Sequence, residues 1–82
     1  MKVKVLGHGC AKCKTLYGET AMAIASLGLE AELEKVEKIE EIMAYRIMAT
    51  PALVIDGEVK SAGRLPSPAE ITAWLTSAGA KT

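Results

Sequence analysis

Two cysteines separated by two residues form the motif with the clearest chemical consequence in this sequence. Cys10 and Cys13 stand where a short alternating strand pattern ends and a helical pattern begins. A thiol in the first turn of a helix lies near unpaired backbone N–H groups and the positive end of the helix dipole, which both favour the thiolate. Lys12 and Lys14 add positive charge beside the motif. We therefore expect the Cys10 thiol to have a pKa lowered toward neutrality, as a cysteine nucleophile needs.

The two thiols are expected to have different roles in thiol–disulfide exchange. Cys10 lies nearer the loop and is the candidate for the exposed nucleophile, which would attack a substrate disulfide. Cys13 lies one turn further on, within the apolar stripe of the helix, and would resolve the mixed disulfide at Cys10. Lys12 is expected to be an exposed modulator of the thiolate, and His8 could favour the thiolate when protonated or relay a proton. These roles are those of a dithiol oxidoreductase, for which we expect no bound cofactor or metal.

A structural disulfide and a metal site are the alternatives for the same residues. Closing so short a loop stabilises a fold by only about 2 kcal/mol in the entropy model, and a cytosolic thiol pool would keep it reduced. His8, Cys10 and Cys13 form an H-x-C-x-x-C pattern, but structural zinc sites use four ligands and the chain has one His and two Cys. Binding of Cu(I) by the two thiolates is therefore the alternative function, as in a soft-metal chaperone.

The composition excludes several other classes of protein. The 82 residues suit one small domain spanning 1–82, and a hydrophobic content of 50% excludes intrinsic disorder. Ten basic residues balance ten acidic ones and aromatic residues make up 4%, so we expect no nucleic-acid partner. No apolar run reaches the roughly 18 residues of a membrane helix, and no signal peptide precedes the first strand pattern. We expect a soluble, cytoplasmic monomer without a membrane partner.

Apolar periodicity predicts the element order βαβαββα. Asp56-Gly57 is a strong signal for a hairpin turn between the last two strands. The final helix has a complete start signal, because Ser67 can cap it, Pro68 fits its first position and Glu70 completes a capping box. Strands are expected at 2–6, 29–34, 52–55 and 58–62, and helices at 10–27, 39–47 and 67–78.

The predicted order constrains the topology and the packing. The first helix is long enough for a right-handed crossover, which would make the strands that it joins parallel neighbours. The hairpin adds two antiparallel strands, which gives a four-stranded mixed sheet covered on both faces by three helices. Gly28 is the stop signal of the first helix, and Gly18 inside that helix indicates close packing. Met22, Met43 and Met48 are expected in core or rim packing rather than in a metal-binding set.

Three segments in a fixed order carry a family resemblance. They are G-H-G-C-A-K-C at 7–13, M-A-T-P-A-L-V-I-D-G-E-V at 48–59 and P-S-P-A-E-I at 66–71. Together they resemble the small archaeal and bacterial thioredoxin/glutaredoxin-like proteins of the thioredoxin-like superfamily, often called redox-active disulfide proteins. The resemblance covers essentially the whole chain. It implies a thioredoxin-like α/β fold and a thiol–disulfide oxidoreductase that carries electrons in cell redox homeostasis.

The resemblance also implies roles for single residues. Cys10 matches the family's nucleophile and Cys13 its resolving cysteine. Pro51 matches the cis-proline that faces the disulfide in this fold. The backbone at Thr50 matches the position that pairs with an extended substrate chain. The implied partners are disulfide-containing proteins and an upstream reductase.

The sequence departs from the patterns of both thioredoxins and glutaredoxins. Gly9 stands where thioredoxins have Trp, and Ala11-Lys12 replaces their Gly-Pro. Ala49-Thr50-Pro51 stands where glutaredoxins have Thr-Val-Pro, and residues 61–64 replace their double glycine and acid. Glutathione is therefore not expected as a direct partner.

Overall fold

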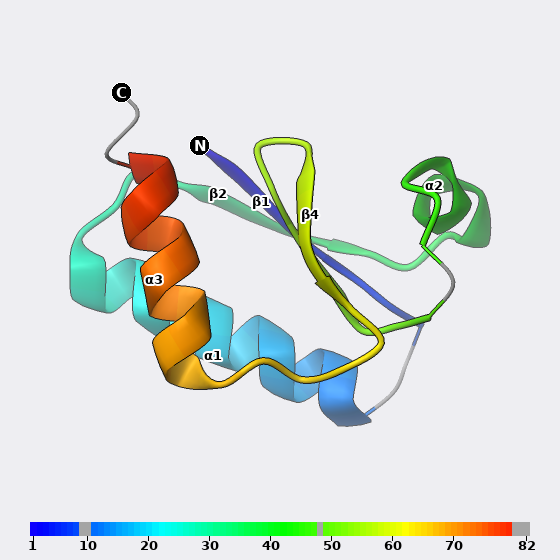
Figure 1. The fold of residues 1–82 in the computed structure, drawn as a ribbon, viewed down its shortest axis with the longest axis horizontal. Helices are drawn as coiled ribbons and strands as arrows, with labels where there is room; N and C mark the ends of the chain where they lie inside the picture. Colours follow the sequence, from blue (N-terminus) through cyan, green and yellow to red (C-terminus); the bar gives the residue numbers. More distant parts are fainter. Residues whose placement is uncertain (9–10, 48, 80–82) are drawn as a thin grey trace.

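Over the residues that the structure describes, 1–8, 11–47 and 49–79, the chain forms a four-stranded mixed sheet with three helices. Its elements are β1 (Lys2–Leu6), α1 (Ala11–Leu27), β2 (Glu32–Val36), α2 (Ile39–Ala44), β3 (Ala52–Ile55), β4 (Glu58–Ala62) and α3 (Pro68–Gly79). In this computed structural model, α1 and α3 pack on one face of the sheet and α2 packs on the other (Figure 1). The predicted fold class is confirmed.

Strand β1 lies inside the sheet, whose strand order is β2-β1-β3-β4. It runs parallel to β2, so α1 is the crossover connection that the sequence predicts. On its other side β1 pairs antiparallel with β3, and Leu6 lies opposite Ala52. Strands β3 and β4 form the predicted hairpin, in which both turn residues, Asp56 and Gly57, have positive φ. The end of β1 and the start of β3 therefore meet at the same end of the sheet.

Alternation along the strands divides the core into two clusters, because successive strand residues point to opposite faces. The cluster beneath α1 and α3 contains Val3, Val5, Leu16, Leu53, Ile55, Ile71 and Leu75. The smaller cluster beside α2 contains Leu6, Val36, Ile42, Ala52 and Val54. Both faces of the sheet are thus covered, as predicted. Within the described ranges, no helix has the length and hydrophobicity that a membrane crossing needs.

Helix α1 ends in a Schellman motif that uses a residue expected to begin the next strand. Gly28 has a φ of 65°, and its N–H donates to the Ala25 carbonyl at 3.2 Å. The Leu29 N–H donates to the Ile24 carbonyl at 3.2 Å, so the cap satisfies two carbonyls of the last turn. Gly28 ends the helix, as predicted. Strand β2, however, begins at Glu32 rather than at Leu29, because the Leu29 N–H is hydrogen-bonded within the cap.

Helix α2 is shorter than the sequence predicts. The Tyr45 N–H donates to the Ile42 carbonyl at 3.2 Å, a bond to the third preceding residue that tightens the last turn. Arg46 has a φ of 58°, a left-handed conformation that does not continue an α-helix. The helix therefore ends before Ile47, which the predicted range includes.

Three expectations about helix packing are wrong. Met43 and Met22 are 66% and 72% exposed, so neither packs in the core or at its rim. A Cβ atom on Gly18 would meet no atom of a packed neighbour within 4 Å, so α1 is not closely packed there. Helical spacing places these residues on a face, but it does not show whether another element covers that face. Met48 lies outside the described residues.

Helix α3 begins with the capping box that the sequence predicts. The Ser67 hydroxyl accepts a hydrogen bond from the Glu70 N–H at 3.2 Å, and the Glu70 carboxylate accepts one from the Ser67 N–H at 3.1 Å. Arg64 donates to both carboxylate oxygens of Glu70, at 3.0 and 2.7 Å. These bonds fix the segment after β4 to the start of α3.

Stability is expected to depend on pH through Glu70. The Arg64 guanidinium and then the Ser67 N–H lower the pKa of this carboxyl from 4.5 to about 2. Because the pKa is lower in the folded state than in the unfolded state, the stabilisation is present above pH 4.5 and is lost as the pH falls toward about 2. The urea midpoint of the wild-type protein should therefore fall more over this range than that of Glu70→Gln. Equal falls for the two proteins would contradict this role of Glu70.

Candidate active site

The candidate active site lies where β1 leaves the sheet and where the chain enters β3. Leu6 and Ala52 are paired across these strands. Their neighbours Gly7 and Pro51 therefore come together beyond the ends of the strands. A Cβ atom on Gly7 would lie 3.9 Å from the Pro51 Cα and 3.1 Å from the Cys13 Cβ. Because Cys13 belongs to the start of α1, the end of β1, the start of α1 and the residues just before β3 meet at this point.

Cys13 is the member of the cysteine pair that the structure describes. The residue is 6% exposed, and its sulfur is disulfide-bonded. Its burial agrees with its predicted place on the apolar stripe of α1. Cys10 is the only other cysteine in the sequence and lies outside the described residues.

The Thr50–Pro51 peptide bond is cis. Thr50 is exposed, whereas Pro51 is buried and its carbonyl accepts a hydrogen bond from the Gly63 N–H at 3.0 Å. Gly63 has a φ of 80°, and a Cβ atom there would lie 3.0 Å from the Ala49 Cβ. Gly63, which follows β4, thus holds residues 49–51, the proline segment, in place. The sequence pattern did not indicate this role.

The start of α1 carries positive charge. Lys12 and Lys14 are exposed, as is His8 before the helix. The first turn of α1 contains no acidic residue. The lysines and the N–H groups of the first turn therefore act in the same direction and favour an anionic sulfur nearby. The effect of His8 and Lys12 on the thiols stays a prediction.

Gly7 is a site residue to which the sequence assigns no role, although it begins the segment at 7–13 that carries the family resemblance. It is buried, and its N–H donates to the Val36 carbonyl at 3.0 Å, which extends the contact between β1 and β2. A Cβ atom on Gly7 would overlap the Cys13 Sγ. No local signal could reveal this contact, because the fold alone brings the two residues together.

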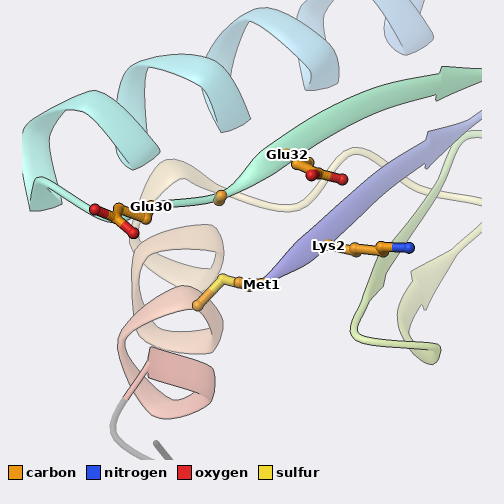
Figure 2. Close-up of a pocket in the computed structure, with 5 residues that line it drawn as sticks. Met1, Lys2, Glu30 and Glu32 are labelled. Carbon is orange, nitrogen blue, oxygen red and sulfur yellow. The ribbon is translucent and has the colours of Figure 1, made fainter.

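A hollow elsewhere on the molecule does not belong to this site. It is lined by Met1, Lys2, Glu30, Ala31 and Glu32. Figure 2 shows the Lys2 and Glu32 side chains projecting to the same side of the sheet, while Met1 points toward α3. Lys2 and Glu32 begin β1 and β2, whereas Gly7 follows the end of β1. The hollow and the candidate active site therefore lie at opposite ends of β1.

The element order and the disulfide at the start of α1 define a thioredoxin-like α/β protein. Residues 1–76 match the family model described as the thioredoxin domain. A thioredoxin from Methanothermobacter thermautotrophicus is 39% identical over 76 residues, which cover 93% of this chain and 99% of that protein. A thioredoxin from Methanocaldococcus jannaschii is 33% identical over 75 residues, which cover 92% of this chain and 86% of that protein. The chain belongs to the thioredoxin family, a family of thiol–disulfide oxidoreductases, and the resemblance found in the sequence is confirmed.

Gly63→Ala is expected to cost more stability than Gly57→Ala, its matched control. The two glycines have nearly the same φ, 80° and 81°. A Cβ atom therefore adds a similar backbone cost of about 1–2 kcal/mol at either position. At position 57 it would meet nothing within 4 Å, whereas at position 63 it would press against Ala49 at 3.0 Å. Urea unfolding of both variants measures the difference, and equal losses would show that the fit between Gly63 and the proline segment is loose.

Proposed function

We propose that the protein reduces disulfide bonds in other proteins, with Cys10 and Cys13 as its redox-active dithiol. One observation carries the proposal: Cys13 is buried and disulfide-bonded, and its sulfur packs against Gly7, which also lies next to Pro51. A resolving thiol has to be shielded from outside disulfides, and the burial of Cys13 meets this requirement. Membership of the thioredoxin family supports the same class of reaction.

The proposed reaction has two exchange steps. The Cys10 thiolate attacks one sulfur of a substrate disulfide, and the other substrate sulfur leaves as a thiolate. The Cys13 thiolate then attacks the Cys10 sulfur, which releases the second substrate sulfur and forms the disulfide of the protein. The substrate gains two electrons and becomes a dithiol after taking up two protons. An upstream reductase has to return two electrons to the protein before the next turnover.

Positive charge at the start of α1 supports the first step. The helix dipole and the lysines at positions 12 and 14 favour the thiolate form of a sulfur in this turn. Lys12 lies between the two cysteines in the sequence and is exposed, so we assign it a modulating role. His8 is exposed before the helix and would act in the same way when it is protonated.

Thr50 and Pro51 are proposed to bind the substrate chain. Pro51 has no N–H, and its carbonyl already accepts a bond from Gly63. The backbone of a substrate would therefore pair with the exposed Thr50, as a short added strand. The expected substrates are disulfide-containing proteins rather than glutathione, and a cytoplasmic, monomeric state is part of the same hypothesis.

Serine variants should separate the roles of the two cysteines. Cys10→Ser is expected to abolish exchange, because no thiol remains at the attacking position. Cys13→Ser should instead accumulate a mixed disulfide with the substrate, because no second thiol releases it from Cys10. Reduction of a model protein disulfide, followed by mass spectrometry under non-reducing conditions, measures both effects. Normal turnover by Cys13→Ser would show that the assignment of roles is wrong.

A redox titration tests the proposal against soft-metal binding by His8, Cys10 and Cys13. Among the described residues, which leave out Cys10, no three His, Cys, Asp or Glu side chains form a group that could hold a metal ion. With a chelator present throughout, titration in dithiol buffers should show a reversible two-electron transition between about −120 and −270 mV. Absence of a disulfide, or loss of the fold when metal is removed, would favour the metal-binding alternative.

A further inference from the structure

We propose that Gly7 is a positioning residue, whose missing side chain leaves the space that the Cys13 sulfur occupies in the disulfide form. A residue with a Cβ atom at position 7 would then shift the equilibrium of the protein from disulfide toward dithiol. This inference rests on the proposed dithiol function, and it adds a residue outside the C-x-x-C motif and the proline segment.

The contacts of Gly7 carry the first step of the argument. Its backbone is fixed on one side by the hydrogen bond from its N–H to the Val36 carbonyl at 3.0 Å. A Cβ atom on this backbone would overlap the Cys13 Sγ and lie 3.1 Å from the Cys13 Cβ. The next nearest atom is the Pro51 Cα at 3.9 Å, an ordinary contact distance. The sulfur is therefore the atom that excludes a side chain at position 7.

The backbone conformation of Gly7 does not itself require glycine. Among the described glycines, those with positive φ are Gly28, Gly57 and Gly63. Gly7 is not in this group, so an alanine could adopt its φ without the cost of a left-handed conformation. The requirement for glycine at this position comes from packing against Cys13 alone.

The disulfide form has less freedom to accommodate a Cβ atom than the dithiol form. In the disulfide, the Cys13 sulfur is covalently fixed, and the residue is only 6% exposed. In the dithiol, the side chain of Cys13 can turn about its Cα–Cβ bond to another staggered position. A Cβ atom on residue 7 therefore penalises the disulfide more than the dithiol, and the reduction potential becomes less negative.

Equilibration with dithiothreitol tests this effect. In the reaction, the protein disulfide takes two electrons from dithiothreitol, so that the protein becomes a dithiol and the reagent forms its cyclic disulfide. For Gly7→Ala we expect the equilibrium constant to shift toward the protein dithiol by at least about tenfold, which is about 30 mV for two electrons. Gly18→Ala is the matched control, because its added Cβ meets nothing within 4 Å, and its potential should equal that of the wild type.

A double-mutant cycle tests the contact itself. Gly7→Ala should raise the unfolding equilibrium constant of the oxidised protein by at least about tenfold, which corresponds to 1.4 kcal/mol. In a Cys13→Ala background most of this effect should disappear, because the Sγ is gone and only the contact at 3.1 Å remains. If Gly7→Ala alone does not fold, recovery of folding in the double variant supports the same conclusion.

The results that would overturn the inference are distinct from those that would overturn the proposed function. The sulfur is not the excluding atom if Gly7→Ala leaves the reduction potential unchanged, if it lowers stability equally in both backgrounds, or if neither variant folds. A wild-type protein whose disulfide dithiothreitol does not reduce reversibly would instead refute the dithiol function. The double-mutant cycle uses the oxidised wild type as its reference and would still decide the Gly7–Cys13 contact.

Discussion

Hydrogen bonding between β1 and β3 determines which residues can meet at the end of the sheet, because it holds Leu6 opposite Ala52. The register is itself fixed by burial on both faces. A slip of one residue along β1 would exchange Val5, which faces α1 and α3, with Leu6, which faces α2. Core packing therefore brings Gly7 to Pro51, and the geometry of the site depends on side chains that take no part in its chemistry.

Local signals in the sequence predict the structure correctly where it is determined by residues that are neighbours in the chain. Ser67 and Glu70 cap each other across one turn, and Asp56-Gly57 closes a hairpin between adjacent strands. Prediction was wrong where one residue fits two patterns. Leu29 alternates with its neighbours like a strand residue, but its N–H completes the cap of α1. Such competition between a cap and a strand is decided by backbone hydrogen bonds that apolar periodicity does not report.

The candidate site could be predicted only in part. Cys13 was recognisable because a thiol at a helix start has a distinctive chemistry, whereas Pro51 was indicated by the family resemblance. Gly7 and Gly63 contribute through the atoms that they lack, and the space that each leaves has meaning only once Cys13 and Ala49 are in place. Contacts of this kind form between different elements of the fold, so single-sequence reasoning does not detect them.

Helix α2 contributes one buried residue to the core, whereas α1 and α3 together contribute five. The buried residue of α2 is Ile42, which belongs to the smaller cluster, whereas α1 and α3 pack on the larger one. Tyr45 follows α2, and the centre of its ring lies 5.9 Å from the Lys4 Nζ. Segments with few buried contacts open locally at a lower free energy than the whole fold. Thr50 and Pro51 come after α2 and before β3 in the chain. An opening confined to α2 would therefore take place a few residues before Thr50 and Pro51, while the cluster beneath α1 and α3 stays packed.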